Sequence, residues 1–132
     1  MKNNLEKTIL NILSENDFAF GNDLVYLPDF ELSFNQLFQQ KVYTKLEIEY
    51  CNLFNPAILR YASTWAAKEA VYKAIKQLYK TALPFKKIEI TREKISGKPS
   101  VNLPKKFKKP NISLSISHDG DYVWAVALVK KY

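Results

Sequence analysis

The chain has 132 residues, 47% of them hydrophobic, with only 3 glycines and 6 prolines. This composition predicts one folded domain with its own core and excludes a largely disordered chain, and the apolar stretches are too short for a membrane span. The net charge of +7, from 20 Lys and Arg against 13 Asp and Glu, favours an anionic partner such as a nucleic acid, a phosphorylated cofactor or an acidic protein.

The first apolar segment and the only cysteine indicate where in the cell the protein is located. An apolar stripe predicts an amphipathic helix at about residues 3–14, and charges interrupt it, so we expect no secretion signal. Cys51 can form neither an internal disulfide nor a cysteine-based zinc site. We therefore expect Cys51 to be a small buried residue in a reducing compartment, and the protein to be cytoplasmic.

The next elements are a strand and two helices. Residues 18–27 predict a strand, in which Gly21 allows another backbone to approach closely. Residues 33–40 predict a short helix that begins at Ser33. Thr44 and Glu47 have the spacing of a capping box, which predicts a helix to about residue 53.

The longest predicted helix runs from about Asn55-Pro56 to Tyr79, because proline suits a first helical turn. One residue type recurs at every fourth position of this helix. Such a smooth ridge predicts close packing on a sheet, and it is formed by Ala62, Ala66, Ala70 and Ala74.

The second half of the chain predicts strands. They are expected at residues 87–91, 100–103, 112–117 and 122–130, with a turn at 118–121. Helices early and paired strands late predict an α+β fold, with an antiparallel sheet packed against the long central helix. We expect residues 1–132 to form a single domain, with the N-terminal helix as an addition to it.

Within the long helix, Glu69 and Lys73 lie four residues apart and share one face. A carboxylate that can hold a hard cation, beside an ammonium group, suits the handling of a pyrophosphate. A surface salt bridge is the alternative interpretation. Two other residues complete the pattern: Asp23 on the early strand, and His118, the only histidine, at a strand end.

This pattern resembles the 4′-phosphopantetheinyl transferases, and most of all their short, holo-acyl-carrier-protein synthase type. The resemblance covers about residues 18–129. It rests on four segments in family order: Gly21-Asn22-Asp23-Leu24-Val25, residues 38–47, Trp65-Ala66-Ala67-Lys68-Glu69-Ala70-Val71-Tyr72-Lys73-Ala74, and Ser115-Ile116-Ser117-His118. A weaker match consists of Ile88-Glu89-Ile90 followed by Gly97-Lys98-Pro99.

The resemblance implies Mg²⁺-dependent transfer of 4′-phosphopantetheine from coenzyme A to a serine of an acyl or peptidyl carrier protein. Asp23 and Glu69 match the family's metal ligands, and Lys73 matches the lysine that faces the phosphates. Our hypothesis for catalysis is that either Glu69 or a metal-bound water takes the serine proton, and that Lys73 stabilises the departing phosphate.

Further residues match the family's coenzyme A site. His118 matches the histidine near the nucleotide 3′-phosphate, and Lys98 and Pro99 match contacts to the adenosine end. Lys68 is expected either to support the site or to be solvated, and Trp65 to lie in the core.

Three departures from the family pattern concern recognition. Asp29 replaces an arginine that meets the carrier, and Thr64 replaces the arginine before the helix motif, where Arg60 one turn earlier can substitute. Residues 75–80 replace a glycine-rich stretch. The carrier protein and the nucleotide contacts are therefore not defined by the motifs.

The chain contains one such unit, whereas long members of the superfamily contain two and form the site between them. The resemblance thus implies a homotrimer with sites at subunit interfaces and an acidic apo carrier protein as partner. Low salt is expected to speed encounter with that carrier.

Two alternatives remain from the sequence. One is a degenerate relative that binds coenzyme A or a carrier without turnover. The other is a basic nucleic-acid-binding module using Lys105–Lys109 with Phe107 interleaved, although no predicted element carries a dense basic face with exposed aromatic residues. A magnesium nuclease is excluded because the chain contains no Glu-x-Lys or Asp-x-Lys.

Overall fold

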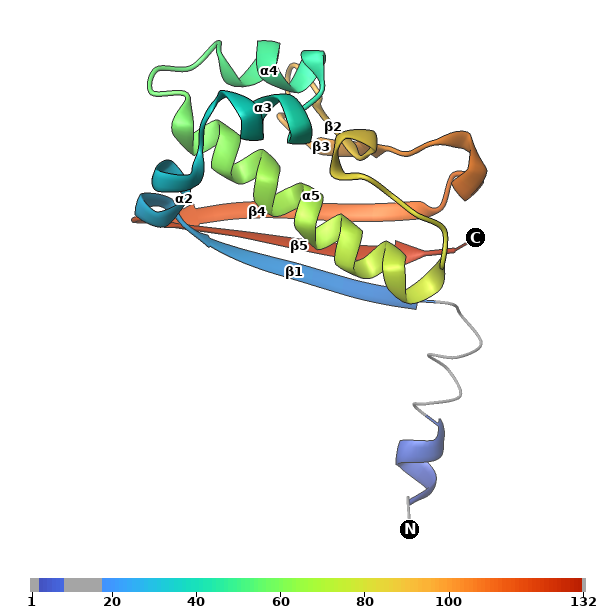
Figure 1. Ribbon diagram of the computed structural model, residues 1–132. Coiled ribbons are helices and arrows are strands. Elements are labelled where there is room, and N and C mark those ends of the chain that lie inside the picture. Colours follow the sequence, from blue (N-terminus) through green and yellow to red (C-terminus); the bar gives the residue numbers. More distant parts are fainter. Residues whose placement is uncertain (1–2, 9–17, 132) are drawn as a thin grey trace.

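A computed structural model describes residues 3–8 and 18–131, and Figure 1 shows its arrangement. Residues 4–8 are helical. The other elements are β1 (Phe18–Tyr26), α2 (Leu27–Ser33), α3 (Gln36–Val42), α4 (Lys45–Cys51), α5 (Ile58–Leu78), the 3₁₀ turn η1 (Phe85–Lys87), β2 (Glu89–Arg92), β3 (Pro99–Asn102), the 3₁₀ turn η2 (Lys105–Phe107), β4 (Asn111–Asp119) and β5 (Tyr122–Lys130).

The main sheet is antiparallel, with the strand order β1-β5-β4, and β2 and β3 form a separate two-stranded hairpin. Helix α5 lies along one face of the main sheet, α3 and α4 lie on the side of α5 away from the sheet, and α2 lies at the end of the sheet where β1 ends (Figure 1). The opposite face of the sheet has no covering element among the described residues. The predicted α+β class, with a long helix on an antiparallel sheet, is confirmed.

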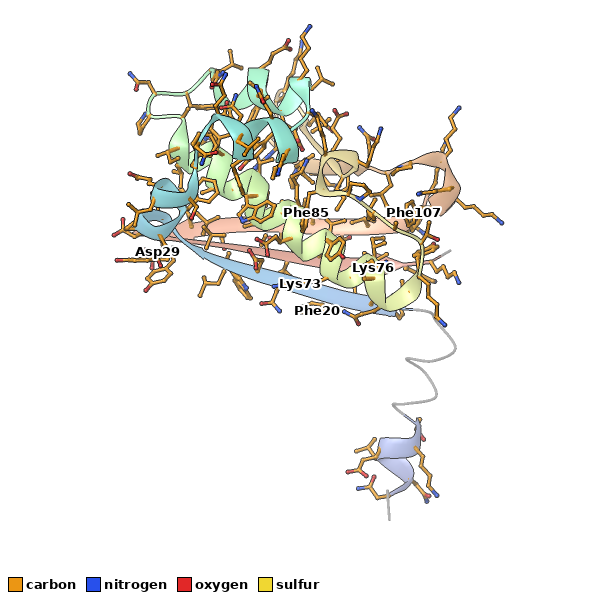
Figure 2. All side chains as sticks on the ribbon, viewed as in Figure 1. Phe20, Asp29, Lys73, Lys76, Phe85 and Phe107 are labelled. Atoms are coloured by element: carbon orange, nitrogen blue, oxygen red, sulfur yellow. The ribbon has the colours of Figure 1, made fainter. Side chains whose placement is uncertain are left out.

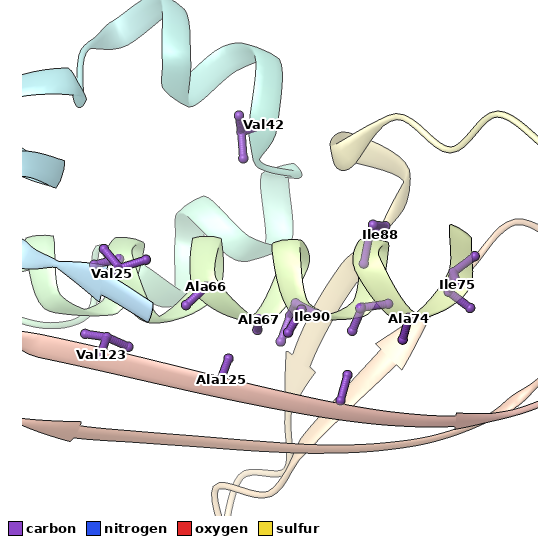
Figure 3. Close-up of a cluster of buried hydrophobic side chains, with 14 of the residues drawn as sticks. Val25, Val42, Ala66, Ala67, Ala74, Ile75, Ile88, Ile90, Val123 and Ala125 are labelled. Atoms are coloured by element: carbon purple, nitrogen blue, oxygen red, sulfur yellow. The ribbon is translucent and has the colours of Figure 1, made fainter. Parts of the chain in front are cut away.

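The contact between α5 and the sheet depends on small residues. The alanine ridge is fully buried, and Figure 3 shows Ala66, Ala67 and Ala74 facing the strand that carries Val123 and Ala125. On β1, Gly21 meets α5 so closely that a Cβ atom there would lie 2.1 Å from the Ala70 carbonyl oxygen. Both predictions, a packing ridge and a close approach at Gly21, are confirmed.

A buried ion pair joins α4, α5 and β2. The Lys68 ammonium lies 2.6 Å from Glu47 Oε1 and donates a second hydrogen bond to the Ile88 carbonyl. Glu47 also accepts from the backbone amides of Thr44 and Ile90, and the predicted capping box is confirmed. Lys68 is fully buried, so of its two expected roles, supporting the site or being solvated, the second is excluded.

The helix predicted at residues 33–40 is wrong in its bounds. Ser33 ends α2, which has Pro28 in its first turn, and α3 begins only at Gln36. Asn35 caps α3, because its side-chain oxygen accepts a hydrogen bond of 2.8 Å from the amide of Phe38. Both Ser33 and Asn35 are good cap residues, and the structure uses the second.

Other boundaries also differ, and β2 begins at Glu89 rather than at residue 87. Helix α5 begins at Ile58 rather than at Asn55-Pro56, and β4 continues through His118 to Asp119, so the turn into β5 is Gly120-Asp121. Of the N-terminal helix expected at residues 3–14, residues 4–8 are helical and residues 9–14 lie outside the described residues. Within the described residues, no helix is both long enough and apolar enough to cross a membrane.

Candidate active site

Two elements, α5 and β1, bring three of the predicted site residues together. Glu69 and Lys73 lie one turn apart on α5. On β1 the side chains alternate in direction, and Asp23 lies between Gly21 and Val25 on the face that packs against α5. The carboxylate of Asp23 therefore points at the helix, not at the open face of the sheet.

Lys73 is held by β1 through two hydrogen bonds. Its ammonium lies 2.9 Å from Asp23 Oδ1 and 3.1 Å from the carbonyl oxygen of Asn22. The side chain of Asp23 is 11% exposed and that of Lys73 is 49% exposed, so the amine can still be reached from solvent. Figure 2 shows Lys73 between the two ends of the molecule.

Glu69 completes the cluster and is electrostatically unusual. Burial, and then the charge and hydrogen bond of Asp23, raise the pKa of Glu69 to about 7, against the opposing effects of Lys73 and of a hydrogen bond from Trp65. The two carboxyl groups are thus close enough to share a proton. A raised carboxylic acid pKa from burial and a like charge is typical of catalytic and metal-binding sites.

The donor set of this cluster fits magnesium. Two facing carboxyl groups oppose each other's ionisation, and a hard divalent cation between their oxygens would relieve that opposition. Mg²⁺ takes oxygen ligands and keeps several waters, so one or two carboxylates together with substrate phosphates are sufficient for it. The described residues contain no cluster of three or more His, Cys, Asp and Glu side chains that could hold a metal on its own.

His118 lies elsewhere on the sheet. Strand β5 separates its strand, β4, from Asp23 on β1. His118 lines a cavity of about 540 Å³ together with residues that include Asn22, Leu24 and Trp124, whose side chains are on the open face of the sheet. Within one chain, the structure therefore does not unite His118 with the cluster of Asp23, Glu69 and Lys73.

Lys98 and Pro99 also lie apart from the cluster. They belong to the β2–β3 hairpin, which Figure 1 shows on the opposite side of α5 from β1. Arg60 has its guanidinium 4.2 Å from the centre of the Phe54 ring, on the α4 side of α5. Thr64 is buried, with its hydroxyl 3.8 Å from the sulfur of Cys51.

Two residues that support the site were missed by the sequence analysis. The Gln77 amide donates to the Phe20 carbonyl at 2.7 Å and to the Lys73 carbonyl at 3.1 Å, which ties α5 to β1 one turn beyond Lys73. Trp65, expected only as a core residue, lies close enough to Glu69 for its indole N–H to lower the pKa of that carboxyl group. Both residues lie four positions from a site residue, so helical spacing was the signal that could have found them.

The chain was compared with known proteins. The family model of the 4′-phosphopantetheinyl transferase superfamily matches residues 19–127. A holo-[acyl-carrier-protein] synthase of Wolbachia pipientis is 36% identical over 120 residues, covering 85% of this chain and 96% of the relative. That of Aquifex aeolicus is 36% identical over 104 residues, covering 74% and 84%.

A solved structure agrees with these relatives. It is an ACPS–CoA complex of Chronobacterium ammoniagenes, with a TM-score of 0.73 and 29% identity, covering 86% of this chain and 96% of the other. The family model and these relatives define an enzyme of the phosphopantetheinyl transfer class. The chain belongs to the 4′-phosphopantetheinyl transferase superfamily, as the motifs predicted.

Proposed function

We propose that this protein transfers 4′-phosphopantetheine from coenzyme A to a serine hydroxyl of an apo acyl carrier protein and releases adenosine 3′,5′-bisphosphate. The observation that carries this proposal is the cluster of Asp23, Glu69 and Lys73, which joins two carboxyl groups and one amine at the α5–β1 contact. It is supported by relatives that are holo-[acyl-carrier-protein] synthases over nearly their whole length, and by a structural neighbour that is a complex with coenzyme A.

The reaction is one displacement at phosphorus. The serine oxygen attacks the phosphorus that bears the pantetheine arm, a new P–O bond forms, and the bond to the oxygen shared with the nucleotide phosphate breaks. Glu69 accepts the serine proton. Lys73 donates hydrogen bonds to the departing phosphate, which carries away the electron pair of the broken bond. Positioning and charge neutralisation supply most of the acceleration in such reactions.

We propose that Mg²⁺ is held by Asp23 and Glu69. When bound there, it neutralises the charge of the pyrophosphate. The protein's own contribution is to orient the two carboxyl groups, because Lys73 fixes Asp23 and the Trp65 indole fixes Glu69.

We further propose a homotrimer in which neighbouring subunits complete the coenzyme A site with His118, Lys98 and Pro99. The support is the open face of the sheet, where large apolar side chains are exposed and suit burial against another copy. They are Phe18, Phe20, Leu24, Tyr26, Tyr122, Trp124 and Leu128. A cytoplasmic location agrees with the single free cysteine.

The test is incubation with coenzyme A, Mg²⁺ and a panel of apo carrier proteins, followed by mass spectrometry of the carrier. We expect the mass gain of one phosphopantetheine group. Asp23→Ala, Glu69→Ala and Lys73→Ala are each expected to lower the rate by about a hundredfold or more, because each removes charge stabilisation of the transition state. Glu93→Ala, an exposed residue of the hairpin loop, is the matched control and should react normally.

Two results would contradict the proposal. Wild-type rates in both the Asp23→Ala and Glu69→Ala variants would remove the metal assignment. Tight binding of coenzyme A without modification of any carrier would favour a relative that binds but does not turn over.

A further inference from the structure

The charges of this protein are separated along its long axis. Strand β5 has nine residues and runs from Tyr122 to Lys130, a span of about 30 Å. Near its start, the β4–β5 turn meets α2 through a hydrogen bond from the Leu27 amide to the Asp121 carbonyl, and four carboxylates gather there: Asp29, Glu31, Asp119 and Asp121. Figure 2 shows Asp29 and Phe107 at opposite ends of the molecule, with Lys73 between them.

The other end is basic. We call it the lysine end, and it consists of Lys80, Lys105, Lys106, Lys108, Lys109, Lys130 and Lys131. Three short chain segments contribute these lysines, and none of them has an acidic residue: residues 76–81, 104–110 and 126–131. Within the described part of the chain, the ion pairs are Lys68–Glu47 and Lys73–Asp23, so no carboxylate pairs with the lysine end.

A small aromatic contact holds the three segments together. The rings of Tyr79 and Phe107 lie with centroids 5.3 Å apart, and the Tyr79 hydroxyl donates to the Phe107 carbonyl at 3.4 Å. The Lys131 ammonium lies 5.2 Å from the centre of the Tyr79 ring. The lysines that flank Phe107 are therefore presented by an anchored turn, since Phe107 itself is fully buried.

The backbone of this turn is also unusual. Lys108 and Lys109 have φ values of 53° and 50°, in the left-handed region that glycine and asparagine adopt more readily. Both side chains are exposed. Packing in the core does not explain lysine at either position. Binding of an anionic partner does explain it.

We infer that the lysine end is the surface that docks an acidic helical carrier protein, and that the acidic end repels the same carrier and so fixes its orientation. This inference rests on the proposed function. Lys73 lies five residues before Leu78, where α5 ends and Tyr79 follows, which is about 8 Å along the helix axis. A partner seated on the lysine end therefore reaches the cluster within the width of an ordinary protein interface.

The structure favours a protein over a nucleic acid at this surface. Single-stranded nucleic acids bind to basic grooves in which exposed aromatic rings stack on the bases. At the lysine end, Phe107 is fully buried and Lys131 lies over the ring of Tyr79. One ring at this end is exposed, that of Phe18, with the Lys130 ammonium 5.7 Å from its centre. A single ring does not form the series of stacking platforms along a basic groove that single-stranded nucleic acids use.

The experiment compares matched charge changes. The Lys105→Glu/Lys106→Glu variant reverses two charges of the lysine end, and Lys108→Asn/Lys109→Asn removes two while keeping residues that tolerate the left-handed backbone. The control is Lys45→Glu/Lys94→Glu, which makes the same charge change at two exposed positions outside the lysine end. Circular dichroism and thermal unfolding establish that all variants fold.

Transfer kinetics are measured with an apo acyl carrier protein at low and high salt. For both lysine-end variants we expect the KM for the carrier to rise roughly tenfold at low salt, with kcat and the KM for coenzyme A unchanged and a weaker salt dependence. The control pair should behave like the wild-type protein. An unchanged KM for the carrier, an equal rise in the control, or a rise in the KM for coenzyme A instead would overturn the inference.

Two binding measurements separate this inference from the proposed function. The first probe is a carrier whose acceptor serine is replaced by alanine, which can bind but cannot react. Lysine-dependent binding of this probe supports the docking surface even if no carrier is ever modified. The second probe is a single-stranded RNA oligonucleotide, and lysine-dependent binding of RNA with unchanged carrier affinity would overturn the inference in favour of nucleic acid.

Discussion

The Lys73 ammonium lies 2.9 Å from the Asp23 carboxylate, and this ion pair joins α5 to β1 at the candidate active site. It also determines how the two carboxyl groups differ. Asp23 has the amine as a direct partner, whereas Glu69 is buried beside the Asp23 charge. Asp23 is thus held in an ion pair, whereas Glu69 can take up or release a proton near neutral pH.

The first prediction concerns stability against pH without metal. Because the pKa of Glu69 is raised from about 4.5 to about 7 in the folded protein, the folded state binds more protons than the unfolded state between these values. The raised pKa of Glu69 therefore adds to the free energy of unfolding below pH 4.5, and this added stability is lost as pH rises through 7. Urea denaturation in EDTA across this range should show the decline, and Glu69→Gln should reduce it.

Magnesium provides the matching measurement. Above pH 7, added Mg²⁺ should raise the urea midpoint of the wild-type protein, because a ligand of the folded state stabilises that state. The Glu69→Gln variant should gain much less. Equal stabilisation of both proteins by Mg²⁺ would place the ion elsewhere.

The second prediction concerns Gly21. A Cβ atom at this position would lie 2.1 Å from the Ala70 oxygen and 2.8 Å from the Ala74 nitrogen, and both are backbone atoms that cannot rotate away. Gly21→Ala should therefore destabilise the protein by several kcal/mol, on the order of other overpacked core sites. It should also lower transfer activity, because β1 carries Asp23.

Gly120→Ala is the control for Gly21. No atom lies within 4 Å of a Cβ at Gly120, but its φ is +56°, so the expected loss is about 1 kcal/mol from backbone strain alone. Similar losses in the two variants would contradict the steric explanation.

The sequence predicted most of the fold where a single pattern decided the outcome. The bounds of β5 match those expected, and the ridge that includes Ala66 and Ala70 lies on the sheet, because alternation and fourfold spacing are local signals. The division between α2 and α3 was not predictable in this way. Ser33 and Asn35 compete as caps, and the segment also packs through Phe30, Phe34 and Phe38, whose rings contact one another in the tertiary structure.

The candidate site shows the same limit. Helical spacing placed Glu69 beside Lys73, but only the family resemblance linked them to Asp23, which is 50 residues from Lys73 in sequence. No local pattern predicts that Lys68 is buried against Glu47, since most charged pairs lie at the surface. Contacts between distant segments require the folded chain.

The third prediction tests this buried pair. Glu47→Gln leaves the Lys68 ammonium buried without its counter-charge, and Lys68 already has a pKa lowered by burial. The expected loss is about 3–5 kcal/mol in urea unfolding. Glu49→Gln, an exposed carboxylate on the same helix, should change stability by less than about 0.5 kcal/mol.

A double-mutant cycle isolates the interaction. The double variant Lys68→Met/Glu47→Gln should lose less stability than the sum of the two single variants. The reason is that the double variant contains no buried charge without a partner. Strict additivity would mean that the ion pair itself contributes nothing to the stability of the contact between α4 and α5.

The last prediction concerns Cys51. Burial raises the pKa of this thiol to about 11, and its side chain is fully buried against Thr64. Thiolate, rather than thiol, is the reactive form, so a disulfide reagent such as DTNB should react with Cys51 only when the protein unfolds. The reaction rate of the native protein should follow the concentration of urea, and a Ser33→Cys variant, exposed at the end of α2, should react at once without urea. Fast modification of native Cys51 would show that the contact between α4 and α5 opens readily. The slow reaction that we expect would instead show that the buried Glu47–Lys68 pair and the thiol beside it belong to one stable unit beneath the active-site helix.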